Sequence, residues 1–304
     1  MLRIGIDLGG SKIEIIGLDA EGRTLLRRRI TTPQGDYLAT VTALAGLVEA
    51  AENELGQRGS VGVGIPGAES LDTGLIKNAN STCLIGRPLR RDLQALLQRE
   101  VRLANDANCF ALSEATDGAA AGAEIVFGVI LGTGVGGGLV VHGRVLEGAN
   151  RIAGEWGHNP LPAPTEADLP APSCYCGRWG CIESYLSGPA TEAGHTRRCG
   201  QVIGLQKIAG NATAGDAECR ATLDLYVERL ARSLATVINL VDPQVIVLGG
   251  GLSQLPLLYD QVPARWGAYI FSDSVRTRLV APQHGDSSGV RGAAWLWNDA
   301  PGAG

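Results

Sequence analysis

The chain has 304 residues, of which 26 are basic and 31 acidic, and 45% of its residues are apolar. This apolar share excludes a chain that is disordered by composition, and the net charge of −5 argues against nucleic acid as the main partner. Glycine is the outlier: 43 residues are glycine, roughly twice the average share of about 7%. Because they follow no collagen period, the glycines indicate tight turns or backbone that lies close to a ligand.

The first part of the chain alternates apolar runs with turn residues. Strands are predicted over residues 3–8, 12–18 and 24–30, and the run Arg27–Arg29 is interpreted as a solvated strand edge. Residues 37–56 carry apolar side chains at helical spacing and end at a glycine, which predicts a helix. The remaining predicted elements are a strand over 61–65, helices over 89–99, from Asn105 to about residue 115, over 221–240 and over 288–298, and strands at 101–103 and 245–248. Residues 160–173 and 190–220 carry little signal.

A pattern recurs within the chain. Residues 127–144 repeat the order of residues 4–23: a strand, a glycine-rich hairpin, a second strand, a turn and a basic residue. Residues 61–67 and 245–251 form a second matching pair, in which each strand ends in a glycine turn. Two related α/β halves are therefore predicted. The expected domains are 1–115, completed by a C-terminal helix within 285–304, and 116–284.

Two glycine-rich hairpins are candidate phosphate-binding loops, because glycines let backbone N–H groups point at phosphate oxygens. Their candidate contacts are Asp7, Gly9, Gly10, Ser11 and Lys12 in the first hairpin, and Gly132, Thr133, Gly134, Gly136 and Gly137 in the second. Asp7 is a candidate to hold Mg²⁺. A purely structural turn is the alternative for either hairpin alone, and neither matches the P-loop motif.

One histidine and three cysteines have the spacing of a metal site. His158, Cys174, Cys176 and Cys181 supply one nitrogen and three sulfurs, a set that suits structural Zn²⁺. The carboxylates of Glu155 and Glu183 flank this set, so the metal would fix both of them, and carboxylates accept hydrogen bonds from vicinal sugar hydroxyls. Two surface glutamates are the alternative.

The sequence offers no membrane span or signal peptide. The uncharged stretch Ile125–Val141 holds six glycines and is interpreted as a β-hairpin. Asp7 and the glycines after it interrupt any apolar signal core. The chain is therefore expected to be cytoplasmic, and its cysteines are not expected to form a disulfide framework.

These motifs resemble those of the ROK family of bacterial sugar kinases (repressors, open reading frames, kinases). The matching motifs, which occur in the family's order, are Asp-Leu-Gly-Gly-Ser-Lys at 7–12, Gly-Thr-Gly-x-Gly-x-Gly at 132–138, Glu-x-Gly-His at 155–158 and Cys-x-Cys-Gly-x-x-Gly-Cys-x-Glu at 174–183. The resemblance covers essentially the whole chain. Within the family, residues 61–67, 77–82, 99–109 and 284–297 resemble the fructokinase, or manno(fructo)kinase, subgroup.

The resemblance implies an α/β, two-domain actin-like ATPase (ribonuclease H-like) fold with duplicated halves and an active-site cleft between them. It implies that Gly249, Gly250 and Gly251 lie beside the adenosine of ATP. It also implies that Asp106 takes the proton of the attacking sugar hydroxyl and that Asn105 orients the sugar. Further sugar contacts are expected from Asn80, Glu155, His158 and Glu183. A helix cap is the alternative reading for Asp106.

The resulting expectation is an ATP- and Mg²⁺-dependent hexose kinase that phosphorylates the 6-hydroxyl of D-fructose, with D-mannose as a second acceptor. The alternatives are a glucokinase or N-acetylhexosamine kinase of the same family, and a non-catalytic sugar-sensing protein. Repressors of the family add a helix-turn-helix domain, for which a first strand at residue 3 leaves no room. The family resemblance further implies a homodimer.

Overall fold

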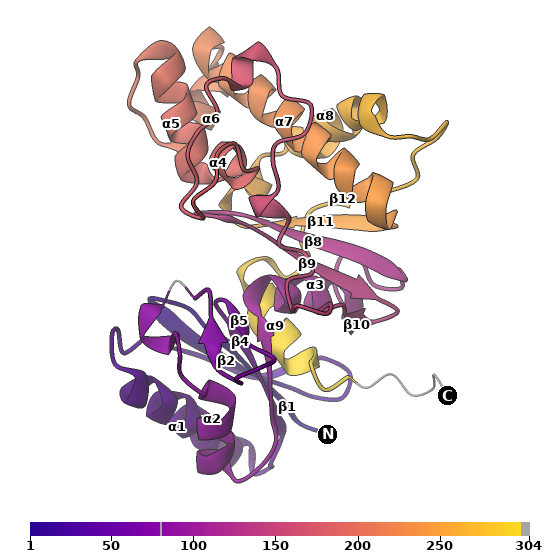
Figure 1. The fold of residues 1–304 in the computed structure, drawn as a ribbon. Coiled ribbons are helices and arrows are strands. Elements are labelled where there is room, and N and C mark those ends of the chain that lie inside the picture. The colour runs from indigo at the N-terminus through magenta and orange to yellow at the C-terminus, as the bar shows by residue number, and fades with distance from the viewer. Residues whose placement is uncertain (80, 299–304) are drawn as a thin grey trace. The chain divides into compact units, whose positions relative to one another are not determined.

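The computed structural model describes residues 1–79 and 81–298 (Figure 1). The predicted sugar contact Asn80 and the last residues of the predicted C-terminal segment, 299–304, lie outside this description. Within the described residues, no helix combines the length and the apolar character that a membrane crossing requires.

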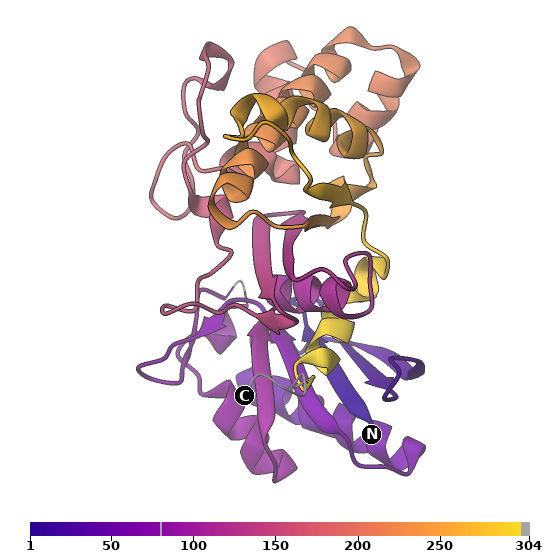
Figure 2. The same cartoon turned by 90° about the vertical axis from the view of Figure 1, so that its right-hand side faces the viewer.

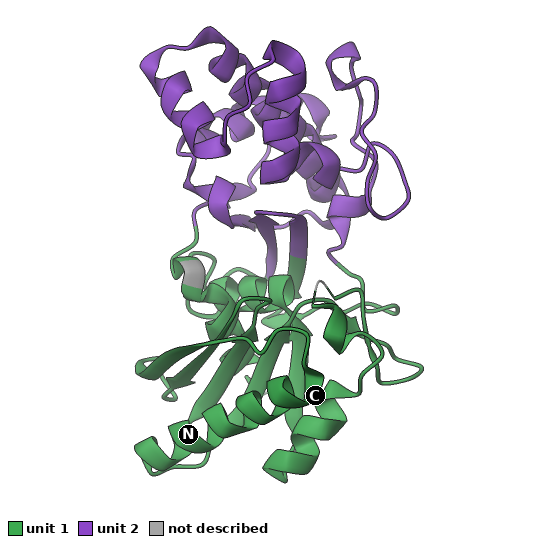
Figure 3. Ribbon diagram, turned by 90° about the vertical axis from the view of Figure 1, so that its left-hand side faces the viewer, with its two compact units in different colours: residues 1–124, 138–153, 282–304 green, residues 125–137, 154–281 purple. Residues whose placement is uncertain are grey.

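The chain forms two compact units (Figure 3). Unit 1 comprises Met1–Glu124, Gly138–Ala153 and the described residues from Pro282 onward, and unit 2 comprises Ile125–Gly137 and Gly154–Ala281. The predicted boundary between residues 115 and 116 therefore differs from the structure. Residues 138–153 belong to unit 1 because the chain packs tightly at Gly138, where an added Cβ would lie 2.4 Å from the carbonyl oxygen of Ala107.

The sheet of unit 1 has the strand order β3-β2-β1-β4-β7. Its strands are β1 (Arg3–Leu8), β2 (Lys12–Leu18), β3 (Thr24–Thr31), β4 (Ser60–Ile65) and β7 (Val101–Asn105). The first three form an antiparallel meander, and β4 and β7 continue the sheet in parallel from β1. A separate short pair consists of β5 (Ala68–Glu69) and β6 (Ile76–Lys77).

Helices cover both faces of this sheet. They are α1 (Tyr37–Leu55), α2 (Leu89–Leu97), α3 (Asp106–Thr116) and α9 (Ser288–Trp295). Alternate residues of β1, such as Ile4 and Ile6, join α1 and α2 in one apolar core. On the other face, Gly5 and Gly62 meet α9 directly: an added Cβ would lie 2.1 Å from the Val290 oxygen and 1.9 Å from the Ala293 oxygen, respectively. Figure 2 shows α9, in yellow, beside these strands.

The second sheet repeats the arrangement of the first. Its strand order is β10-β9-β8-β11-β12, with β8 (Ile125–Leu131), β9 (Val135–Val141), β10 (Arg144–Val145), β11 (Val245–Gly249) and β12 (Arg278–Val280). Here too the first three strands in the chain are sequential neighbours, and the last two join in parallel. The helices of unit 2 are α4 (Glu183–Leu186), α5 (Gly188–Cys199), α6 (Leu205–Ala214), α7 (Ala217–Val241) and α8 (Leu257–Trp266). The two sheets thus confirm the predicted duplication.

Short 3₁₀ helices occur within the connections. Their bounds are η1 (Thr82–Leu84), η2 (Trp156–His158), η3 (Glu166–Asp168), η4 (Gly251–Gln254), η5 (Gly267–Tyr269) and η6 (Gly285–Ser287). The helices α5 and α6 were not predicted, because residues 190–220 lack an apolar stripe: α5 buries mainly polar or small residues such as Thr191 and His195. The helix α7 begins earlier than predicted, at the cap Asp216, whose Oδ1 accepts a hydrogen bond from the Cys219 N–H at 2.7 Å.

The contact of Gly62 with α9 yields a stability prediction. We expect Gly62→Ala to destabilise the protein by about 2 kcal/mol or more, because the new methyl group would overlap the Ala293 oxygen. Gly46→Ala is the matched control, since Gly46 is exposed within α1 and nothing lies within 4 Å of an added Cβ. That change should raise stability by about 0.5–1 kcal/mol. Thermal unfolding of both variants measures this, and an unchanged midpoint for Gly62→Ala would contradict the packing described.

Candidate functional site

The hairpin between β1 and β2 exposes groups that could donate hydrogen bonds to a phosphate. The Gly9 N–H donates to the Lys12 oxygen at 3.0 Å, and the Thr32 hydroxyl donates to the Gly9 oxygen at 2.7 Å, so the turn is held from both sides. An added Cβ at Gly9 would lie 2.8 Å from the Lys12 oxygen, so this closure requires glycine. The side chains of Ser11 and Lys12 remain exposed at its tip, beside the exposed Gly10.

Asp7 lies at the end of β1 in a row of charged side chains. It is paired across the sheet with Glu14, which is in turn paired with Arg29. Burial, followed by the negative charges of Asp106 and Glu14, raises the pKa of Asp7 to about 6. Because a cation near Asp7 would relieve this repulsion, the position is suited to Mg²⁺.

The side chain of Glu14 was not predicted to matter, although it orders this row. It is 1% exposed and binds the guanidinium groups of both Arg27 and Arg29, the latter at 2.6 Å. The interpretation of Arg27–Arg29 as a solvated strand edge is therefore incomplete. A signal was available in the sequence: Glu14 is a charged residue between the apolar residues Ile13 and Ile15 of a predicted strand.

Asn105 and Asp106 stand where β7 passes into α3. Asn105 is the cap residue: its Oδ1 accepts from the Ala107 N–H at 2.9 Å, and its Nδ2 donates to the Gly67 oxygen at 3.1 Å. Asp106 is the first residue of the helix and is exposed, and its Oδ1 accepts from the Ala107 N–H at 2.8 Å. The cap is therefore Asn105, whereas the alternative reading gave that role to Asp106.

The hairpin between β8 and β9 is held by a carboxylate from the cysteine-rich segment. Glu183 Oε2 accepts from the Val135 N–H at 2.8 Å, and an added Cβ at Gly134 would lie 2.7 Å from the same oxygen. At the start of the turn, the Gly188 N–H donates to the Gly132 oxygen at 2.8 Å. Glu183 thus has a structural bond to the loop in addition to its predicted sugar role.

The Glu155–His158 segment packs against the same hairpin. Trp156 Nε1 donates to the Gly136 oxygen at 3.0 Å, and an added Cβ at Gly157 would lie 2.2 Å from the Val135 oxygen. Glu155 itself is exposed. The predicted phosphate hairpin and the segments that carry Glu155 and Glu183 therefore form one cluster within unit 2.

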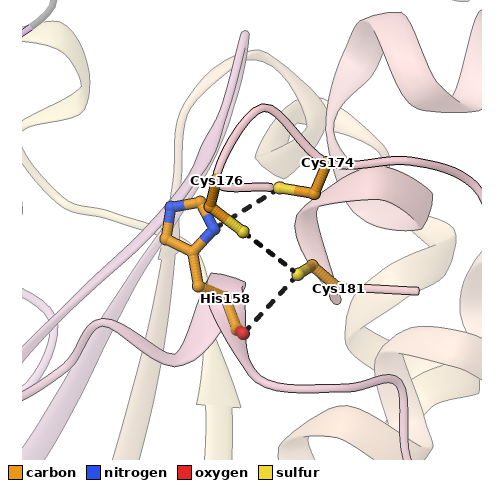
Figure 4. A group of neighbouring side chains, drawn as sticks. All are labelled: His158, Cys174, Cys176 and Cys181. Carbon is orange, nitrogen blue, oxygen red and sulfur yellow. Dashed lines mark hydrogen bonds between the residues drawn. The ribbon is translucent and has the colours of Figure 1, made fainter. Parts of the chain in front are cut away.

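The four predicted metal ligands come together (Figure 4). Their ligand atoms lie within 4.8 Å of one another, with His158 Nδ1 at 3.6 Å from Cys174 Sγ and Cys176 Sγ at 3.6 Å from Cys181 Sγ. This donor set fits a tetrahedral zinc ion. Hydrogen bonds from the backbone and the guanidinium of Arg178 lower the pKa of Cys176 to about 6, which favours the thiolate that binds metal.

A tyrosine that was not predicted orients the histidine ligand. The Tyr175 hydroxyl lies 3.1 Å from His158 Nε2, on the side of the ring away from the sulfurs. This leaves Nδ1 for a metal and fixes the orientation of the ring, as outer partners of metal-bound histidines do. The position of Tyr175 between Cys174 and Cys176 is the feature of the sequence that could have indicated this role.

The predicted adenosine contacts lie on a tight turn. β11 ends at Gly249, Gly250 has a φ of 81°, and η4 begins at Gly251. An added Cβ at Gly250 would lie 2.3 Å from the Leu131 oxygen, so the turn packs on the end of β8. This turn and the hairpin at Gly132 belong to unit 2, whereas Asp7, the first hairpin, Asn105 and Asp106 belong to unit 1.

Comparison with known proteins covers nearly the whole chain. The ROK family model matches residues 3–300. The N-acetyl-D-glucosamine kinase of Pectobacterium atrosepticum is 40% identical over 296 residues, which are 96% of this chain and 97% of the relative. The enzyme of the same name from Photobacterium profundum is 41% identical, over 96% of this chain and 98% of the relative. Neither relative is named as a fructokinase.

Solved structures give the same family. The ROK hexokinase from Thermus thermophilus superimposes with a TM-score of 0.87 at 33% identity, over 97% of both chains. The ROK glucokinase from Streptomyces griseus, solved with glucose and AMPPNP, gives 0.76 at 27% identity, over 97% of this chain and 99% of that one. With its duplicated sheets and its glycine hairpins, the chain belongs to the ROK family and has the actin-like ATPase fold.

Proposed function

We propose that this chain is an ATP-dependent sugar kinase whose preferred acceptor is N-acetyl-D-glucosamine. The observation that carries the choice of acceptor is the identity of 40% and 41%, over 96% of the chain, to two N-acetyl-D-glucosamine kinases. The phosphate hairpins and the carboxylates Asp7 and Asp106 support the kinase chemistry, because phosphoryl transfer needs positioning, charge neutralisation and a proton acceptor.

The sequence-based preference for D-fructose is replaced by the alternative, an N-acetylhexosamine kinase. The motifs could not rank the sugars, because amide, carboxylate and imidazole groups bind the vicinal hydroxyls that all hexoses share. The relatives that support N-acetylglucosamine match along the whole chain, whereas the fructokinase resemblance rested on four short stretches.

Sugar-stimulated ADP release tests the acceptor. We expect kcat/KM for N-acetyl-D-glucosamine to exceed that for D-glucose, D-mannose and D-fructose by about tenfold or more, since a site built to hydrogen-bond an amide penalises sugars that lack it. A highest value for D-fructose would restore the earlier assignment and reject this one. Absence of ADP release with every sugar would reject the kinase itself.

Asp106 is assigned as the proton acceptor for the attacking hydroxyl. It is an exposed carboxylate at the first residue of α3, and the cap bonds of Asn105 fix the helix start that carries it. With a pKa of about 6, Asp7 is mostly ionised at neutral pH and is assigned to Mg²⁺. The Mg²⁺ of the MgATP substrate would neutralise phosphate charge during transfer.

The role of Asp106 predicts a selective loss of turnover. We expect Asp106→Asn to lower kcat by about 10²–10⁴-fold, because the amide cannot accept the proton. Sugar affinity, measured by calorimetry, should change by only a few-fold, since the amide keeps the shape of the side chain. Asp72→Asn, at an exposed turn of unit 1, is the matched control and should leave kcat unchanged. A near-normal kcat for Asp106→Asn would refute the assignment.

We also assign structural zinc to His158, Cys174, Cys176 and Cys181. The clustered donors support it, as does the Tyr175 contact that leaves Nδ1 of His158 toward the sulfurs. When bound, zinc would cross-link residues 158–181 and so hold the segments that carry Glu155 and Glu183.

Metal analysis tests this site. The purified protein should contain about one zinc per chain, and Cys176→Ser should lose most of it and lower the thermal midpoint by about 5 °C or more, because metal binding contributes folding energy. Cys83→Ser is the control, because this partly buried cysteine lies in unit 1, outside the cluster. A folded, active wild-type protein without zinc would contradict the site.

A further inference from the structure

We propose that unit 2 contains a second binding site, for a small phosphorylated sugar, in the cavity between η3 and the helices α5 and α7. The cavity has a volume of about 370 Å³, within the range of small-molecule sites. It is lined mainly by residues 166–172, 191–198 and 222–229, together with Tyr185. Two of these ranges fall within residues 160–173 and 190–220, which carry little sequence signal.

The floor of the cavity is polar: it contains the buried side chains of His195 and Thr222, which the guanidinium of the exposed residue Arg198 joins. His195 is fully buried, and its Nδ1 lies 2.7 Å from the Thr222 hydroxyl. The guanidinium of Arg198 donates to the same hydroxyl at 2.6 Å. Burial of a polar group costs free energy unless the group is hydrogen-bonded. Here the hydrogen-bonded groups lie together at one cavity. Such convergent polar groups in a cavity are typical of a ligand site.

The lining carries a surplus of positive charge. Asp168 has no exposed side-chain surface and binds both Arg229, at 2.8 Å, and Arg232, at 3.0 Å, so one carboxylate faces two cations. Arg197 lines the cavity and is exposed, and within the described residues no carboxylate lies within 4.0 Å of it. Of the three lining arginines, Arg198 also binds Glu218 and Arg229 binds Asp168, so among the described lining residues Arg197 is the guanidinium left for a ligand. Guanidinium groups bind phosphate through paired hydrogen bonds.

The walls are suited to a compact ring. The rings of Tyr185 and Tyr226 and the side chains of Leu225 and Pro172 line the cavity, and the Arg229 guanidinium lies 5.0 Å from the centre of the Tyr185 ring. Apolar walls, a hydrogen-bonding floor and a small surplus of cations match a hexose with one phosphate group. A nucleoside triphosphate carries more negative charge than this surplus balances.

A short helix connects this cavity with the phosphate hairpin. The Tyr185 hydroxyl donates to the main-chain carbonyl oxygen of Asp168 at 2.9 Å, and both residues line the cavity. Two residues earlier on α4, Glu183 accepts from the Val135 N–H in the hairpin. A ligand that repositions Tyr185 would therefore act on the hairpin between β8 and β9. Binding should then change kcat, in addition to being detectable by direct titration.

Calorimetry on the whole chain tests the proposed second site. The catalytic site is first filled with AMPPNP and with the sugar that gives the highest kcat/KM. Titration with N-acetyl-D-glucosamine 6-phosphate or D-glucose 6-phosphate should give about one bound equivalent, whereas the unphosphorylated sugars should give none at this second site. Addition of the same phosphates should change kcat of the wild-type enzyme at saturating substrates.

Two variants and a control locate the binding. Arg197→Ala should weaken it by about tenfold or more through the lost phosphate contact. Gly194→Leu should block the cavity, because Gly194 lines it and an added Cβ there would lie 3.8 Å from the Arg197 guanidinium, which leaves room for the larger side chain. Arg276→Ala, an exposed arginine of unit 2 that does not line the cavity, should bind like wild type.

Three results would overturn the site: no binding with the catalytic site occupied, unchanged binding in both Arg197→Ala and Gly194→Leu, or inorganic phosphate binding as tightly as the hexose phosphates. The inference does not require the proposed acceptor or the kinase activity. If no sugar stimulates ADP release, the titration is made on the free protein, and binding that depends on Arg197 would keep this inference while the proposed function fails.

Discussion

Direct contact of backbone with backbone, at positions where a side chain would not fit, is the constraint on which the rest of the structure depends. In unit 1, Gly5 and Gly62 let α9 lie on the sheet, and Gly292 lets α9 meet α3, where an added Cβ would lie 1.6 Å from the Cys109 oxygen. In unit 2, Gly157 brings the Glu155–His158 segment onto the hairpin between β8 and β9. Such contacts leave little room for adjustment, because packed interiors do not yield to an added methyl group without strain. The glycine excess therefore reflects close packing of elements as well as loops.

That packing places charges where they perturb one another. The face of β1 that meets α9 carries Asp7, and an added Cβ at Gly289 of α9 would lie 3.5 Å from its Oδ2. Burial there raises its pKa, and the neighbouring carboxylates of Asp106 and Glu14 raise it further. Arg29 offsets part of this repulsion from the far side of Glu14. A cation or a phosphate-bound metal beside Asp7 would offset the repulsion that remains between these like charges.

Much of this arrangement could be predicted from sequence, and the exceptions have physical causes. The strands at 3–8 and 12–18, the helix ending at Gly56 and the clustering of His158 with three cysteines were predicted because their signals are local: alternation, a stop residue and ligand spacing. The helices α5 and α6 lack such a signal, since their buried sides are short and partly polar. The ion pairs of Glu14 and the bond from Glu183 to Val135 depend on tertiary contacts, which no local pattern encodes. The motifs could not rank the acceptor sugars, because amide, carboxylate and imidazole groups bind hydroxyls that all hexoses share.

The four-residue helix α4 shows how separate sites in unit 2 share one constraint. Cys181 lies two residues before the start of α4, Glu183 at its first position holds the hairpin between β8 and β9, and Tyr185 forms a wall of the cavity. A segment of this length has too few internal hydrogen bonds to be stable alone, so its position is set by what it contacts. A metal bound at the cysteines would fix α4 on its Cys181 side, and a ligand in the cavity would contact it on its Tyr185 side. Glu183 lies between Cys181 and Tyr185 in the chain, so its bond with the Val135 N–H is one route by which a change at either site would reach the hairpin, beside the contacts of Trp156 and Gly188.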